Sequence, residues 1–148
     1  MINNNELITW SNQLSCGITL IDEQHKRLVE LVNEMFDHVT GNDVQEHDYF
    51  NRVIQETVKY IKIHFTTEEK ILLVTEYRGY IEHKKEHERF IKAVLENIRD
   101  YETGRRITLS TFTRFLKDWI LSHIALVDRQ YFEYLRKNKL NYIAEKVG

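Results

Sequence analysis

The chain has 148 residues, with no proline, five glycines and one cysteine, and its 21 basic and 23 acidic residues give a formal net charge of −2. This length predicts one domain, residues 1–148, and the scarcity of helix-breaking residues predicts an all-α protein. Basic residues are interspersed with acidic ones, which argues against a nucleic-acid partner, and no apolar run approaches the ~20 residues of a membrane span.

Cys16 is the only cysteine, so the chain cannot form an internal disulfide, and a reducing compartment is expected. The first six residues have neither the basic nor the apolar region of a secretory leader. We therefore expect a cytoplasmic protein.

The predicted elements begin with an N-terminal arm over residues 1–17, which is apolar in places but lacks a helical period. A first amphipathic helix follows over about residues 19–39, because apolar residues recur there at helical spacing. They are Ile21, Leu28, Val32 and Phe36.

Three more helices are expected, from about residue 44 into the mid-seventies, over residues 81–101, and from about residue 109 to Tyr131 or beyond. Gly41, Gly79 and Gly104 mark the turns between them. Four long helices joined by short turns predict an up-down-up-down antiparallel four-helix bundle, over about residues 18–137. The tail, residues 138–148, is predicted to form a short extra helix.

Two pairs of potential metal ligands lie in the middle of the chain. His64 and Glu68 are four residues apart, as are His83 and His87. On a helix this spacing puts both side chains of a pair on one face, where they can reach a single point. Imidazole and carboxylate form the mixed nitrogen and oxygen set that iron, zinc and manganese accept. The sequence therefore predicts a metal centre between helices.

Two further histidines, His25 and His123, are in register with the apolar stripes of their helices, whereas His38 and His47 flank the first turn. Because consecutive helices run in opposite directions, the five inward histidines meet near one end of the bundle. A lone histidine on an apolar face is more often a hydrogen-bonded core residue than a ligand. Five at one level, with a carboxylate, favour the metal.

Asp128 lies five residues after His123, and a regular helix would rotate it about 140° away. Spacing alone does not place it at the site. A π-bulge between the two residues would do so, and such bulges occur often at functional sites.

These motifs resemble those of the hemerythrin family, specifically the single-domain bacterial hemerythrins, over nearly the whole chain. The resemblance rests on Trp10, Gly17 and four motifs in order: Asp22-x-Gln24-His25-x-x-Leu28, His64-Phe65-x-x-Glu68-Glu69, His83-x-x-x-His87-x-x-Phe90 and Trp119-Ile120-x-x-His123-Ile124-x-x-x-Asp128.

The resemblance implies a cofactor of two non-heme iron ions. Three histidines would bind one iron, namely His83, His87 and His123. His25 and His64 would bind the other. Glu68 and Asp128 would bridge the two, together with an oxo or hydroxo group from water. One coordination position then stays open for dioxygen on the iron that has two histidines.

Three residues share the face of His123 and would line an apolar oxygen pocket: Trp119, Ile120 and Ile124. They are equally compatible with plain core packing. Gln24 and Glu69 are possible partners of the ligands. Because no side chain near the site is an evident general acid, base or nucleophile, we expect an oxygen carrier or store rather than an enzyme.

Other interpretations use the same residues. His83-Lys84-Lys85-Glu86-His87 matches the His-x-x-Glu-His pattern of zinc proteases, with Glu86 as the base, but leaves three histidines unexplained. A ferritin-like oxidase would need Glu-x-x-His pairs, which the chain lacks. An oxygen or nitric-oxide sensor, a redox sensor or a slow peroxidase would share all seven ligands, and a purely structural bundle would leave the histidines without a role.

Overall fold

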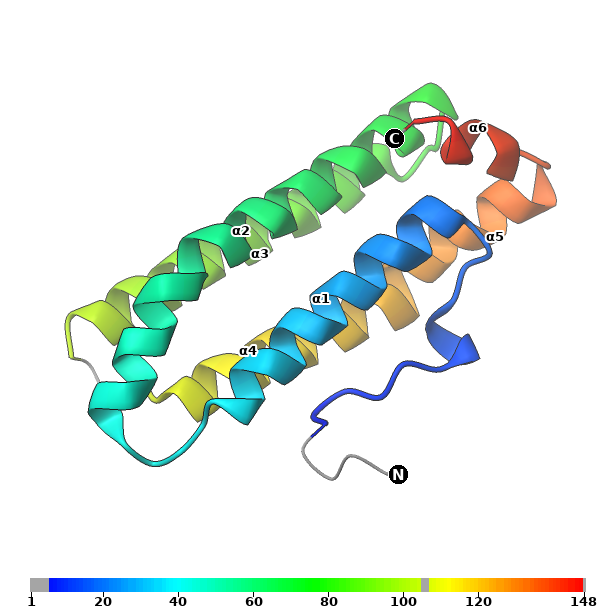
Figure 1. The fold of residues 1–148 in the computed structure, drawn as a ribbon. Coiled ribbons are helices and arrows are strands. Elements are labelled where there is room, and N and C mark those ends of the chain that lie inside the picture. The colour runs from blue at the N-terminus through cyan, green and yellow to red at the C-terminus, as the bar shows by residue number, and fades with distance from the viewer. Residues whose placement is uncertain (1–5, 105–106, 148) are drawn as a thin grey trace.

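The computed structural model of the protein describes residues 6–104 and 107–147. The described elements are all helical: η1 (Asn12–Leu14), α1 (Thr19–Asp37), α2 (Asp43–Val74), α3 (Tyr80–Glu102), α4 (Leu109–Ser122), η2 (His123–Asp128), α5 (Arg129–Lys137) and α6 (Asn141–Glu145). Long helices α1, α2 and α3 and the continuous run α4, η2 and α5 form an elongated antiparallel bundle (Figure 1). The predicted all-α four-helix bundle is confirmed.

The helix ends follow from local residues. The Asn42 side chain accepts a hydrogen bond from the backbone N–H of Gln45 and so caps the start of α2. Gly41 precedes this cap with φ of +81°, a left-handed conformation that a side chain would disfavour. Helix α1 can therefore end and α2 begin within a few residues.

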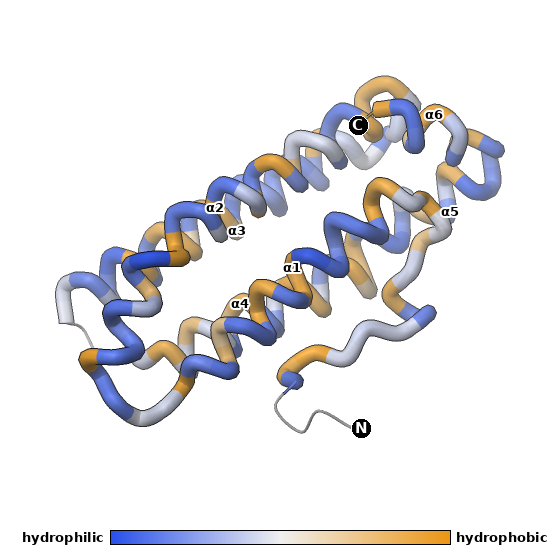
Figure 2. Tube along the Cα trace, viewed as in Figure 1, coloured by the Kyte–Doolittle hydropathy of each residue, from blue (hydrophilic) through white to orange (hydrophobic). Residues whose placement is uncertain are grey.

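A continuous apolar core holds the helices together. Polar and apolar colours alternate along α1 and α2 at about the period of one turn (Figure 2). The largest fully buried side chains come from all four helices of the bundle and include Phe50, Phe90, Phe112, Ile21 and Tyr131. No helix within residues 6–104 and 107–147 is both long and apolar enough to cross a bilayer.

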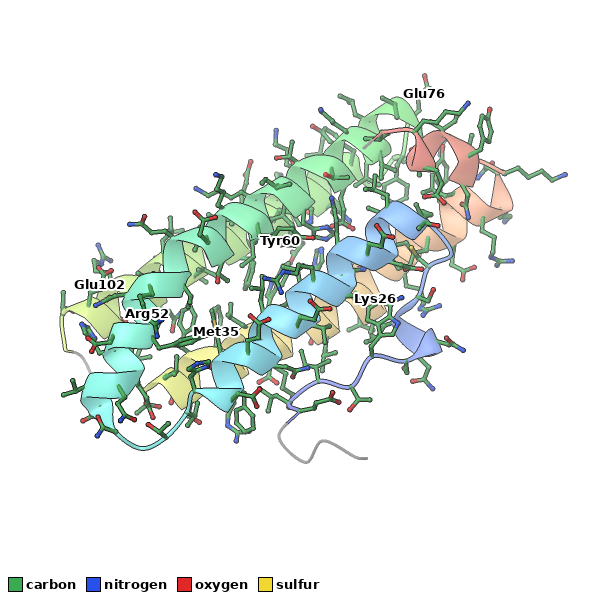
Figure 3. The ribbon with its side chains drawn as sticks, in the orientation of Figure 1. Lys26, Met35, Arg52, Tyr60, Glu76 and Glu102 are labelled. Atoms are coloured by element: carbon green, nitrogen blue, oxygen red, sulfur yellow. The ribbon has the colours of Figure 1, made fainter. Side chains whose placement is uncertain are left out.

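The predicted arm, residues 1–17, packs along the bundle where it is described, from Glu6 onward; residues 1–5 lie outside the described part. The Asp22 carboxylate in α1 accepts hydrogen bonds from Ser15 Oγ and Cys16 N at 2.6 and 2.8 Å. Lys26, labelled in Figure 3, lies 5.4 Å from the centre of the Trp10 ring. The arm is thus fastened to the same helix that carries His25.

The predicted C-terminal helix is also present, as α6, and Gly148 lies outside the described residues. Ala144 is fully buried, and the Glu145 carboxylate accepts a hydrogen bond of 3.1 Å from the backbone N–H of Leu20. Ile18, at the N-cap of α1, provides no side-chain cap. Glu145 therefore caps α1 from the far end of the chain.

We predict that Glu145→Gln lowers the melting temperature of the metal-free protein at pH 7, with a loss of stability of about 0.5 kcal/mol because the carboxylate is exposed. Backbone hydrogen bonds from Leu20 and Thr19 lower the pKa of Glu145, so its contribution exists above the ordinary glutamate pKa and disappears as the pH falls through the lowered value. Thermal melts of both proteins should converge below about pH 4. A constant difference down to pH 3 would contradict this role.

Candidate metal centre

All seven side chains predicted as ligands are buried side by side in the bundle. Helix α1 provides His25, α2 provides His64 and Glu68, α3 provides His83 and His87, and η2 provides His123 and Asp128. Each of these residues is at most 4% exposed. The structure therefore brings together every residue of the predicted set.

The segment η2 is π-helical, so its backbone hydrogen bonds join residues five apart instead of the four of an α-helix. This wider turn places Asp128 on the same side of the chain as His123, and His123 Nε2 lies 2.9 Å from Asp128 Oδ1. A π-bulge is therefore present between His123 and Asp128, where the sequence analysis considered one.

Five of the side chains form one group that could hold a metal ion: Glu68, His83, His87, His123 and Asp128, with one candidate ligand atom of each within 4.8 Å of the others. His83 Nε2 lies 3.1 Å from Asp128 Oδ1, and His87 Nε2 lies 3.4 Å from Glu68 Oε1. The Nε2 atoms of His87 and His123 face each other at 3.2 Å. Converging lone pairs of this kind suit a cation.

A second group consists of His25, His64 and Glu68 and could also hold a metal ion. His64 Nε2 lies 3.2 Å from Glu68 Oε1, and His25 Nε2 lies 3.3 Å from Asp128 Oδ2. Glu68 belongs to both groups, and Asp128 contacts histidines of both. The two carboxylates are therefore shared between two neighbouring sets of imidazoles.

Several buried polar atoms in these groups have no hydrogen-bond partner within the described residues: both ring nitrogens of His25, Glu68 Oε1, His83 Nε2 and both carboxylate oxygens of Asp128. Each such atom costs about 1 to 3 kcal/mol when left unpaired. Bound metal ions would satisfy them, and the nitrogen and oxygen donors suit iron, zinc or manganese. The residues present therefore fit a metal centre.

Without metal, the carboxylates and imidazoles compensate one another. Burial by itself would lower the pKa of His83, but the nearby carboxylates of Asp128 and Glu68 raise it to about 10. Burial would raise the pKa of Asp128, as would the charge of Glu68, but the imidazoles of His123 and His25 hold it below its ordinary value. In the metal-free cluster, protons on the imidazoles thus provide the positive charge that metal ions would otherwise provide, and metal binding must displace these protons.

Three side chains support the ligands from outside. His64 Nδ1–H donates to Gln24 Oε1 at 2.7 Å, and His87 Nδ1–H donates to Glu69 Oε2 at 2.9 Å. These hydrogen bonds turn both Nε2 atoms toward the cluster. The sequence had indicated both partners.

The third supporting residue, Tyr131, had not been identified from the sequence. Its hydroxyl donates to Glu68 Oε2 at 2.5 Å, and its side chain is fully buried. Burial, together with the charge of Glu68, raises the pKa of Tyr131 well above its ordinary value, so the phenol keeps its proton and remains a donor. The only available signal was its position eight residues after His123, on the core stripe of the fourth helix.

Aromatic rings enclose the cluster. Phe65 stacks on His87 with ring centres 3.7 Å apart, and Trp119 stacks on His123 at 4.2 Å. A cavity of about 10 Å³, about the smallest volume that can hold one water molecule, is lined by His25, His64 and His123. Its lining includes all three residues predicted for the oxygen pocket: Trp119, Ile120 and Ile124.

Other polar candidates lie elsewhere. His38 stacks on Tyr49, and His47 stacks on Tyr101, both away from the cluster. Glu86 forms an ion pair with Arg89 on the outer side of α3 and is 39% exposed. A protease base between His83 and His87 therefore has no counterpart in this arrangement.

Four long helices around a buried cluster of histidines and carboxylates define a helical metal-binding domain. The family model for the hemerythrin HHE cation binding domain matches residues 16–135. The chain belongs to the hemerythrin family.

Relatives and structures agree with this assignment. The bacteriohemerythrin of Stenotrophomonas maltophilia is 33% identical over 140 residues, which cover 95% of this chain and 88% of the relative. That of Pseudomonas aeruginosa is 32% identical over 139 residues, or 94% and 88% of the two chains. A crystal structure of wild-type hemerythrin matches with a TM-score of 0.73 at 27% identity, covering 84% of this chain and 95% of that one.

We predict that Tyr131→Phe destabilises the metal-free protein by about 1 to 3 kcal/mol, because it leaves a carboxylate oxygen buried without its donor. Urea denaturation measures this loss. Tyr134→Phe is the matched control, since it removes a phenol on the same helix whose hydroxyl donates to the backbone oxygen of Thr75 instead. A smaller loss for Tyr131→Phe than for Tyr134→Phe would contradict a special role for the Glu68 contact.

Proposed function

We propose that this protein binds dioxygen reversibly at a non-heme di-iron centre and serves to carry, store or deliver it. The observation that carries this proposal is the presence of two ligand groups that share Glu68, with a small, largely apolar cavity that is lined by both histidines of the smaller group and by His123 of the larger one. Membership of the hemerythrin family supports iron as the metal.

In this proposal, His83, His87 and His123 would hold one iron, and His25 and His64 would hold the other. Glu68 and Asp128 would be ligands of both, as their contacts with both sets of imidazoles support. When bound, the two irons would supply the electrons and the open coordination position that dioxygen requires, which no side chain here can provide.

The protein side chains control what reaches the centre. Ile120 and Ile124 are each 3% exposed and contribute apolar surface to the cavity, so they keep water and external acids away from the bound molecule. Tyr131, which does not line the cavity, holds Glu68 by its hydrogen bond. The cavity is too small for a bulky substrate, which supports the binding of a small molecule rather than turnover.

The proposal is tested by the iron content and visible spectrum of the protein, recorded anaerobically after reduction, then in air, then after oxygen is purged. We expect two irons per chain and an absorption band that appears in air and disappears on purging. A band that persists after purging would rule out reversible binding, and one zinc per chain would rule out the di-iron centre. His64→Ala should lose one iron and the reversible band, whereas His38→Ala, outside the cluster, should lose neither.

The cavity wall provides a second prediction. Ile124→Gln places an amide beside the site and should admit water, so we expect the oxygenated protein to lose its reversible band at least about tenfold faster, equivalent to about 1.4 kcal/mol in the barrier. The decay of the band in air at fixed pH measures this rate. Leu126→Gln is the control, because Leu126 lies in the same π-helical segment but is 68% exposed. Equal decay rates of the band in the two variants would show that the cavity wall does not protect the bound oxygen.

A further inference from the structure

The two groups of ligands differ in the residue that supports one histidine of each. Behind His64 stands the amide of Gln24, with Nδ1 and Oε1 at 2.7 Å. Behind His87 stands the carboxylate of Glu69, with Nδ1 and Oε2 at 2.9 Å. The geometries are nearly the same, but one acceptor is a neutral group and the other is an acid.

Each acceptor is held in place by its surroundings. Gln24 Nε2 donates to Thr67 Oγ1 at 3.3 Å, and the Thr67 hydroxyl donates in turn to the backbone oxygen of Ile63 at 3.0 Å. This chain of donors fixes the amide with its oxygen toward His64. Glu69 is 21% exposed, at a groove of about 810 Å³ between α2 and α3, where water can solvate its outer oxygen.

The chemical difference is transmitted through the rings. An imidazole that donates Nδ1–H to a carboxylate gains electron density, and its Nε2 becomes a stronger ligand. A hydrogen bond to an ionised acceptor is roughly twice as strong as one to a neutral acceptor. His87 should therefore donate more charge to a metal than His64 does.

We propose that Gln24 and Glu69 are positioning residues that make the two metal positions electronically unequal, so that the position at His87 favours the higher oxidation state and the position at His64 the lower. This inference rests on the proposed di-iron function. Both histidines of the group with Gln24, His25 and His64, line the cavity, but only His123 of the other group does, so the position that favours the lower oxidation state is the one with the larger share of the cavity lining.

Two isosteric variants test the inference. Glu69→Gln should raise the lower of the two one-electron reduction potentials of the iron-loaded protein, and Gln24→Glu should lower the higher one. Both changes should reduce the difference between the two reduction potentials, Glu69→Gln by raising the lower one and Gln24→Glu by lowering the higher one. A general effect of charge would instead move both steps together.

Binding of Zn²⁺ to the metal-free protein, measured by competition with a chelator, provides a readout that needs neither iron nor oxygen. Glu69→Gln should weaken one of two sites by about tenfold, the lower end of the range for such partners, and Gln24→Glu should strengthen the other. In the Zn²⁺-loaded protein, the Nδ1–H proton resonance of the altered histidine should move, downfield with a carboxylate acceptor and upfield with an amide. Circular dichroism of the metal-free variants checks that each remains folded.

Glu88→Gln is the matched control, since Glu88 is exposed along the same groove and its loss changes the net charge equally. The inference is overturned if Glu88→Gln shifts the potentials as much as Glu69→Gln, or if the two test variants shift both steps in parallel. If the unaltered protein binds two irons but not oxygen reversibly, the proposed function fails while the potentials and Zn²⁺ affinities still decide the inequality of the two positions.

Discussion

The carboxylate of Glu68 is the point on which the structure depends, because both groups of histidines converge on it while it is fully buried. An isolated buried charge is too costly to keep, so Glu68 needs positive or hydrogen-bonding partners on every side. Tyr131 from α5 donates a hydrogen bond to Oε2, and imidazoles from α1, α2 and α3 lie 3.2 to 3.8 Å from the carboxylate oxygens as ion-pair partners, while Oε1 has no hydrogen-bond partner among the described residues. The contacts that form the site are therefore also contacts that pack the helices of the bundle together.

The helices hold the ligand side chains in fixed positions. Ligands on neighbouring helices keep their separation because each helix is anchored by a continuous apolar core above and below the cluster. The arm and the C-terminal helix also fix α1. Asp22 binds the arm, and Glu145 of the C-terminal helix binds the beginning of α1, close to His25. Segments with no ligand of their own thus hold one ligand-bearing helix in place.

The site is also asymmetric in a consistent way. One group has three histidines, one of them backed by the acid Glu69, and the other has two histidines, one backed by the amide Gln24. The small cavity is lined by both histidines of the second group and by one histidine of the first, His123. The number of histidines, their hydrogen-bond partners and their share of the cavity lining therefore all differ between the two groups.

The helical class, the approximate ends of the four helices and the inward-facing residues could be predicted from the sequence, because helical periodicity shows which face is buried and glycines mark the turns. The register of the helices also identified five histidines and Glu68. Asp128 depended on the resemblance to hemerythrins, because regular spacing turned it away from His123, and only the tertiary structure supplied the π-helical segment that brings it back. The role of Tyr131, and which histidine each of Gln24 and Glu69 supports, likewise came from the tertiary structure, since hydrogen bonds between residues such as Glu68 and Tyr131, 63 positions apart, leave no periodic pattern in the sequence.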